Sequence, residues 1–322
     1  MRQNSREQGG FGIMGIVGLA GGKGSTGRDT ICPPTLTRRS FVGAILAVAS
    51  AGLSLMGCAG SGSLSAADGV SAVRARGRLK CGVKTDVPGY GYQDPATGTF
   101  RGMEIDICYE IAARLFSVTA VEAQERGLVD FTGVTAKTRG PLVDSGQVDL
   151  VCATYTITEE RKRSWNFTDP YYTDSIGMLV LKSSGLKTLA DLDGRIVGVG
   201  EGANTKKLMQ QMLKDQGLGD ISVSYPQYLD YPTLAAALAS GNIDVFAIDR
   251  SILGGYFNDS NELLEPDLVF GEQRYGVCTN KQATELSDLC DEVVARMVSD
   301  GSIDALAERY GLLLAEQQHI ER

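Results

Sequence analysis

Few side chains in this sequence of 322 residues are of the kinds that do covalent or metal chemistry. The single histidine, His319, lies near the C-terminal end, which argues against a histidine-based catalytic triad and a histidine metal site. The seven cysteines show no CxxC pair and no other metal-ligand spacing. Residues 198–205, GVGEGANT, fit a relaxed dinucleotide-binding pattern, but the next expected strand ends without the acid that binds a ribose. We therefore expect no metal, no cofactor and no covalent catalysis.

The balance of charge limits the kinds of partner. Lys plus Arg number 31 against 39 Asp plus Glu, a net charge of −8, so broad electrostatic contact with nucleic acid is not expected. An anionic ligand would need a locally positive pocket. The run Arg161-Lys162-Arg163 could supply one, but taken alone such a run is typical of a solvated surface. A lone acid at a strand end, such as Asp249, is likewise typical of a helix cap.

The elements that must position these residues alternate between strands and helices, which predicts an α/β fold. Residues 79–83 and 148–153 form short apolar runs that indicate buried strands. Between them, apolar residues recur every four positions and predict an amphipathic helix: Met103, Ile107, Ile111 and Leu115. A second α/β unit follows, with expected strands at 196–200, 221–225 and 245–248 and expected helices at 205–216 and 231–240.

The order of these elements predicts an α/β protein of two lobes joined by two crossings, with a hinge and an interlobe cleft. Residues 275–278 are strand-like and residues 286–310 helical, so the chain is expected to return to its first lobe. Lobe 1 is expected at residues 73–182 and 271–316, and lobe 2 at residues 183–270. Carboxyl ends of strands and N-termini of helices face such a cleft, which suits a small polar ligand.

The N-terminal part of the sequence indicates an export signal rather than a part of the fold. A short uncharged apolar run ends at Leu-Met-Gly-Cys, which resembles a lipoprotein signal whose cysteine, here Cys58, becomes the lipidated first residue. We expect a signal peptide with a lipobox at residues 1–57 and a flexible tether at residues 58–72. Arg38 and Arg39 also resemble a twin-arginine signal, which leaves the Sec and Tat routes open. The expected location is outside the cytoplasm, anchored to the membrane through Cys58.

Two motifs carry a resemblance to a known family. Residues 149–163, DLVCATYTITEERKR, and residues 166–172, NFTDPYY, resemble the signature of family 3 extracellular solute-binding proteins. The resemblance extends from about residue 73 to residue 311 and implies a two-lobe fold like that of the type II periplasmic binding proteins. Three further motifs are most similar to the aspartate/glutamate-binding group: residues 82–89, GVKTDVPG; residues 135–142, TAKTRGPL; and residues 249–253, DRSIL.

This resemblance implies capture of L-glutamate or L-aspartate, with glutamine also possible, for delivery to an ABC transporter permease. A free amino acid needs a planar cation for its carboxylate and an acid for its ammonium. Arg161 matches the family arginine that binds the α-carboxylate, and Asp249 matches the acid that holds the α-ammonium. Thr154 and Thr156 can add hydroxyl or backbone contacts.

The resemblance also implies residues that select the ligand side chain. Lys84 and Arg139 match basic residues of the acidic-amino-acid group, and two cations in one cleft repel each other unless an anion compensates them. Thr205 matches a threonine that contacts the ligand, and Tyr231 resembles an aromatic residue that closes over it. Pairing of either cation with a nearby acid, and a core position for Tyr231, remain open alternatives.

Two other functions remain open at this stage. The same fold occurs in exported cyclohexadienyl dehydratases, for which Asp86 or Glu104 would be the candidate acid. A sensory or receptor module that reports an amino acid, rather than importing it, is the other alternative.

Overall fold

The computed structural model describes residues 69–312. The expected signal peptide at residues 1–57, its Cys58 and most of the expected tether lie outside the described residues. Within the described range, none of the helices is both long and apolar enough to cross a membrane.

The first lobe contains a five-stranded sheet. The central strand β1 runs parallel to both of its neighbours, so the carboxyl ends of these three strands lie at the same edge of the sheet. Strand β14 comes from the C-terminal part of the chain and is antiparallel to both of its neighbours. In spatial order the strands are β5 (Val129–Gly133), β1 (Leu79–Val83), β6 (Leu150–Cys152), β14 (Cys278–Asn280) and β7 (Trp165–Phe167). A small separate sheet follows β1 in the chain: β2 (Asp86–Val87), β3 (Gly91–Gln93) and β4 (Phe100–Arg101).

Seven helices of the described residues belong to this lobe: α1 (Gly69–Arg76), α2 (Met103–Phe116), α3 (Ala120–Glu125), α4 (Arg139–Asp144), α5 (Glu159–Lys162), α9 (Thr284–Ser299) and α10 (Ser302–Arg309). The predicted amphipathic helix is confirmed as α2, whose four expected apolar residues are at most 1% exposed. α2 ends at Ser117, which adopts a left-handed conformation with a φ of 57°. α9 packs against α2 and joins the C-terminal segment to the first lobe.

The second lobe contains a six-stranded sheet with mixed directions. In spatial order the path is β10 (Gln227–Tyr228), β9 (Val197–Gly200), β11 (Val245–Asp249), β8 (Tyr172–Leu181) and β12 (Asn261–Leu263), and β13 (Phe270–Tyr275) also pairs with β8. Its helices are α6 (Thr205–Asp215), α7 (Tyr231–Ala239) and α8 (Arg250–Leu253), with 3-10 turns η1 (Lys182–Ser184), η2 (Leu189–Leu192) and η3 (Gly254–Tyr256). β9 and β11 are parallel, so their carboxyl ends share an edge.

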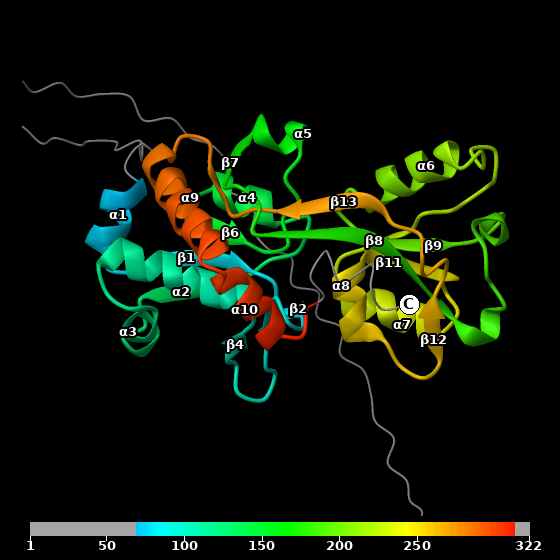
Figure 1. Cartoon of the computed structure of the whole chain (residues 1–322), viewed down its shortest axis with the longest axis horizontal. Coiled ribbons are helices and arrows are strands. Elements are labelled where there is room, and N and C mark those ends of the chain that lie inside the picture. The colour runs from blue at the N-terminus through cyan, green and yellow to red at the C-terminus, as the bar shows by residue number, and fades with distance from the viewer. Residues whose placement is uncertain (1–68, 313–322) are drawn as a thin grey trace, which may run out of the picture. The chain divides into compact units, whose positions relative to one another are not determined.

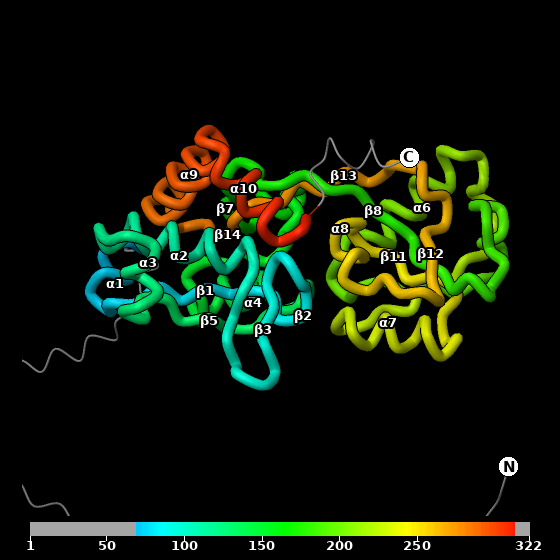
Figure 2. Tube along the Cα trace, turned by 60° about the horizontal axis from the view of Figure 1, so that its bottom comes forward, coloured from blue at the N-terminus to red at the C-terminus, as the bar shows by residue number. Residues whose placement is uncertain are grey.

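Two paired strands connect the lobes. β8 and β13 are antiparallel, with Tyr172 opposite Tyr275 and Ile176 opposite Phe270. Figures 1 and 2 show both strands passing side by side between the elements of the first lobe and those of the second. Strand pairing therefore places β8 in the second sheet, although the sequence assigned residues 172–182 to lobe 1. The sequence of a buried strand does not indicate in which sheet the strand pairs. The boundaries of the lobes remain predictions.

Two other expectations about the elements were wrong. Residues 221–225 do not form a strand, because only Ser224 makes an isolated bridge, to Ile196, before Pro226 interrupts the segment. The helical segment at residues 286–310 is two helices, α9 and α10, because Gly301 adopts a left-handed conformation between them with a φ of 78°.

Candidate functional site

The eight expected ligand-binding residues lie at strand ends, in the segments that follow them, or in the first turns of helices. Five come from lobe 1 and three from lobe 2, so a ligand held by all of them would be enclosed between the lobes. Arg161 is partly buried, and the other seven are at most 7% exposed. They are Lys84, Arg139, Thr154, Thr156, Arg161, Thr205, Tyr231 and Asp249.

Local sequence explains where two of these residues lie. Thr158 caps α5 by accepting the N–H of Arg161 at 3.1 Å, which fixes Arg161 in the only turn of that short helix. Asp230 caps α7 by accepting the N–H of Thr233 at 2.8 Å, and Pro232 occupies the first turn. Helix α7 therefore begins at Tyr231, at the edge of the lobe.

Arg139 is buried against the segment that follows β6. Its Nη1 donates to the carbonyl oxygens of Ala153 at 2.6 Å and Thr154 at 3.0 Å. Thr154 has a φ of 43°, a strained conformation for a β-branched residue, and its N–H donates to Glu104 Oε1 at 2.5 Å. The Thr154 peptide is thus held from both sides. Among the described residues, Arg139 Nε has no hydrogen-bond partner.

Arg161 reaches across the cleft. Its Nη1 donates to the Thr156 carbonyl oxygen at 2.7 Å, and its Nη2 lies 3.3 Å from the carbonyl oxygen of Gly202 in lobe 2. The guanidinium carbons of Arg161 and Arg139 lie 4.7 Å and 3.9 Å from the ring centroid of Tyr155. Burial, together with the charge of Arg139, lowers the pKa of Arg161 to about 10. Two cations on one tyrosine ring favour an anion beside them.

Lys84 is already paired within the protein. Its Nζ lies 2.9 Å from Asp86 Oδ1 and 4.3 Å from the ring centroid of Tyr231. Burial lowers the pKa of Lys84, and the charge of Asp86 opposes that shift. Asp86 also accepts the N–H of Tyr231 at 3.2 Å, so this ion pair joins the lobes. Pairing of Lys84 with a nearby acid, one of the two open alternatives, is what the structure contains.

The acid and two of the hydroxyls of the site have different surroundings. Asp249 accepts the hydroxyl of Tyr275 at 2.6 Å, and burial, with the nearby charge of Asp174, raises the pKa of Asp249 to about 7. The hydroxyl of Thr156 is used within the protein, because it lies 2.6 Å from Gln273 Oε1. The buried Thr205 Oγ1 has no hydrogen-bond partner in the described part of the chain. Thr205 therefore has a hydroxyl that can bond to a ligand.

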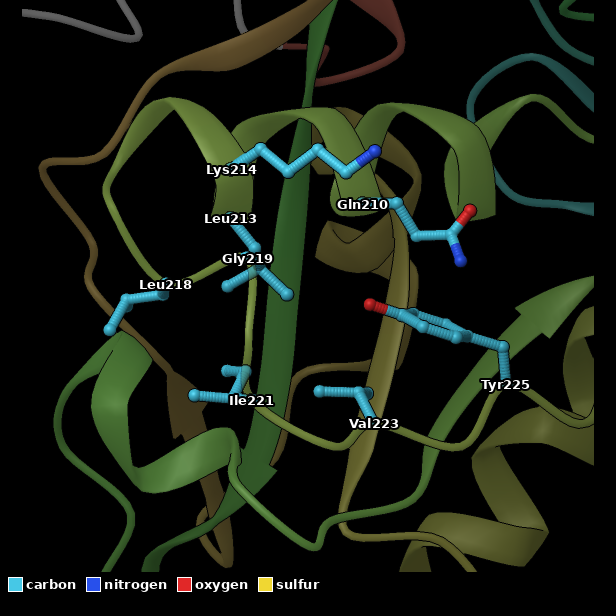
Figure 3. A pocket seen from close by; sticks show the side chains of 8 residues that line it. All are labelled: Gln210, Leu213, Lys214, Leu218, Gly219, Ile221, Val223 and Tyr225. Carbon is cyan, nitrogen blue, oxygen red and sulfur yellow. The ribbon is translucent and has the colours of Figure 1, made fainter.

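The two lobes are in direct contact around these residues. Lys137 Nζ lies 2.6 Å from Glu201 Oε1, and Tyr256 donates its hydroxyl to the Asp86 carbonyl oxygen at 2.8 Å. Beside Arg161, a cavity of 680 Å³ lies between residues 136–165 of lobe 1 and residues 202–208 of lobe 2. A smaller pocket of 190 Å³ is lined by second-lobe residues alone, among them Leu213 and Tyr225 (Figure 3). That pocket does not contact the interlobe site.

The buried carboxyl group of Glu104 gives the site a testable dependence on pH. Burial raises the pKa of Glu104 to about 7, although hydrogen bonds from Tyr171 and Thr154 oppose the shift. A raised pKa in the fold means that the folded state favours the protonated acid. As the pH rises from about 4.5 to 7, the unfolded chain ionises first, and folding loses on the order of 2–4 kcal/mol from this group.

We therefore expect the melting temperature of the ligand-free protein to fall between pH 5 and pH 8, and Glu104→Gln to reduce that fall. The exposed Glu125 is the matched control, since Glu125→Gln should leave the profile unchanged. Thermal unfolding at several pH values measures both. Identical profiles for wild type and Glu104→Gln would contradict the assignment.

Comparison with known proteins agrees with this architecture. The profile of the bacterial extracellular solute-binding proteins, family 3, matches residues 79–312. The ABC transporter glutamine-binding protein GlnH of Bacillus subtilis is 28% identical over 244 residues, which is 76% of this chain and 84% of that protein. The glutamate-binding protein GluB of Corynebacterium glutamicum is 29% identical over 279 residues, covering 84% of this chain and 90% of that protein.

A solved structure of an ancestral arginine-binding protein bound to arginine is 28% identical, with a TM-score of 0.60, and covers 73% of this chain and 98% of that one. The chain belongs to the bacterial extracellular solute-binding proteins, family 3, and has the fold of a type II periplasmic binding protein. Both the expected family and the expected fold class are confirmed.

Residue types and spacing did not single out several residues that make the site. Tyr155 lies within the family motif between two expected threonines, but alternation along a strand does not distinguish a ring buried in the core from a ring that contacts two arginines. Asp86 was considered only as an acid of an enzyme, although its spacing from Lys84 was the available signal. Tyr275 and Asp174 are distant in sequence from Asp249, and no local pattern connects them.

Proposed function

We propose that this protein is the substrate-binding component of an ABC importer and that it captures an acidic amino acid, L-glutamate or L-aspartate, by closure of its lobes. The observation that carries the proposal is the pair of guanidinium groups, of Arg139 and Arg161, that lie against the ring of Tyr155. The charges of both groups also act on the buried carboxyl group of Asp249. Two carboxylates and one ammonium on a small ligand would balance two arginines and one acid. Its relatives GluB and GlnH are binding proteins for glutamate and glutamine.

Each group of the ligand is assigned to a protein group that is not already used within the protein. Arg161 would bind the α-carboxylate, and Asp249 the α-ammonium. Lys84 is compensated by Asp86, which leaves Arg139 Nε, without a partner among residues 69–312, as the donor for a side-chain carboxylate. Glutamine stays a second candidate, because a guanidinium also donates to an amide oxygen. Thr205 would add a hydroxyl contact from lobe 2.

We further propose that the protein is exported and anchored to the outer face of the membrane through a lipid on Cys58, with an ABC permease as its partner. The sequence before residue 69 supports the anchor, and the family supports the permease. Mass spectrometry of the membrane-extracted protein tests the anchor. A diacylated Cys58 at the first position is expected, and an unmodified Cys58 within a longer chain would contradict it.

Isothermal titration of the purified protein, stripped of bound ligand, tests the proposed function. The panel is L-glutamate, L-aspartate, L-glutamine, L-arginine, L-alanine and prephenate. We expect the tightest binding for one of the dicarboxylic amino acids. Preference for a neutral or basic amino acid would keep the family and overturn the role of Arg139. Turnover of prephenate would instead assign the protein to the dehydratases, with Glu104 as the candidate acid.

Closure of the lobes can be tested at one glycine. Gly202 has a φ of 81°, and a Cβ there would lie 2.7 Å from the Cα of Lys137 in the opposite lobe. Gly202→Ala should therefore weaken ligand binding by about tenfold, because the added methyl group would hold the lobes apart. Alanine is also strained at a positive φ, and the control must share that strain. Gly217→Ala is the matched control, because Gly217 has a φ of 74° and a Cβ there would meet no atom within 4 Å. Equal affinities in the two variants would contradict closure at this contact.

A further inference from the structure

A buried acid outside the eight expected residues lies where the lobes are connected. Asp174 is in β8, opposite Gln273 of β13, and is 3% exposed. Its Oδ2 accepts the hydroxyl of Ser251 at 2.5 Å and the N–H of Ser251 at 3.1 Å. Its Oδ1 accepts the N–H of Ser175 at 2.7 Å. A buried carboxylate with this many donors is held in one position.

This acid links the ligand site to a contact with lobe 1. On one side, the hydroxyl of Tyr275 lies 2.6 Å from Asp249 Oδ2 and 3.2 Å from Asp174 Oδ2. On the other side, Ser251 Oγ lies 2.8 Å from the hydroxyl oxygen of Tyr90 in lobe 1. Because Ser251 donates its own proton to Asp174, Tyr90 must be the donor in that contact. The network thus runs from Asp249, through both connecting strands, to the first lobe.

One phenol proton is therefore presented to two buried carboxylates. Two acids that share a donor in a protein interior disfavour each other's ionised form, and the charges of Arg139 and Arg161 offset this only in part for Asp249. Burial raises the pKa of Asp174 as well as that of Asp249. Tyr90 and Tyr275 face Asp174, and the groups that face Asp249 are Arg139, Arg161, Tyr231 and Tyr275. The ammonium of a bound amino acid would add a cation directly at the pair.

We propose that Asp174 is a positioning residue that couples ammonium binding at Asp249 to closure of the lobes, an inference that rests on the proposed function. Without ligand, the two carboxylates carry a shared proton in about half of the molecules at pH 7. When the ligand ammonium binds Asp249, that proton passes to the solvent and both acids are ionised. Asp174 then polarises the Ser251 hydroxyl more strongly, and Ser251 Oγ becomes a better acceptor for Tyr90.

Proton release is the first test. L-Glutamate is titrated into the purified protein at pH 7 in two buffers of different ionisation enthalpy, and the difference in heat counts the protons released. We expect release of about half a proton per ligand, and clearly less in Asp174→Asn, in which the burial of Asp249 remains but the charge of Asp174 does not. No release from the wild type, or unchanged release from the variant, would overturn the coupling. A purely structural role for Asp174 would not change this count.

The second test is a double-mutant cycle on the affinity for L-glutamate, which measures whether Asp174 is coupled to closure of the lobes. Tyr90→Phe and the control Tyr256→Phe each remove one interlobe hydroxyl contact, and each should cost about fivefold in affinity. Combined with Asp174→Asn, the Tyr90→Phe loss should shrink, whereas the Tyr256→Phe loss should multiply in full. Full multiplication in both pairs would overturn the inference.

The outcomes separate the inference from the proposed function. If the wild type binds no amino acid, the proposed function fails and the inference fails with it. If the wild type binds L-glutamate without releasing protons, only the inference fails. Should Asp174→Asn not fold, the proton release of the wild type still tests the inference, and Ser251→Ala takes the place of that variant in the double-mutant cycle, since it removes the hydroxyl between Asp174 and Tyr90.

Discussion

Replacing Arg161 with lysine will lower the affinity for L-glutamate by about 100-fold. The guanidinium of Arg161 bonds to the carbonyl oxygens of Thr156 and Gly202, and it is the donor we assign to the α-carboxylate. A lysine has one nitrogen at the end of a flexible chain, so it cannot bind a carboxylate in bidentate fashion while also bridging the lobes. The charge stays the same, and the loss therefore measures geometry.

The control for this experiment lies two residues further along the chain. Arg163 follows the same short helix, and it is exposed. Arg163→Lys should bind L-glutamate as the wild type does, by isothermal titration. Equal losses in the two variants would assign the effect to a general disturbance of this segment and would contradict the role given to Arg161.

Replacing Asp249 with asparagine will have the second large effect, a loss of about 100-fold or more in affinity for L-glutamate. The asparagine keeps the size of the side chain and an oxygen for the Tyr275 hydroxyl, but it removes the negative charge that the ligand ammonium requires. The ligand-free variant should also be more stable than the wild type at pH 8. Because the pKa of Asp249 is raised to about 7 in the fold, folding free energy is lost as the pH rises from about 4 to 7, and the whole cost is present at pH 8.

A ligand without an ammonium group separates these effects. Glutarate has both carboxylates of glutamate and no ammonium, so its affinity should change little in Asp249→Asn. The exposed Asp259 offers the protein-side control, through Asp259→Asn. If glutarate and L-glutamate lost affinity equally in Asp249→Asn, Asp249 would act on the fold and not on the ammonium.

Much of the framework could be predicted from periodicity and the order of elements. The four-residue spacing of apolar side chains defined α2, and the short apolar runs defined β1, β6, β9 and β11. Prediction failed where structure depends on distant partners. Residues 221–225 have strand-like composition but find only one bridge, and β8 joins a sheet that no local residue specifies.

The site was predictable only in part for a related reason. Charged residues at strand ends and helix starts could be recognised, and they lie at the cleft. The partners of those residues could not, because the hydroxyl that Asp174 and Asp249 share belongs to Tyr275, which comes from the other connecting strand. The neutralisation of Lys84 by Asp86 depends on the turn after β1, and it changes which cation remains for the ligand.

A crystal structure of the protein with L-glutamate is the most direct test of acidic amino-acid capture between the lobes. The account predicts the α-carboxylate on Arg161, the ammonium within hydrogen-bond distance of Asp249 and the side-chain carboxylate on Arg139, with both lobes in contact. L-Glutamate bound by one lobe only, or with its side-chain carboxylate away from Arg139, would contradict it.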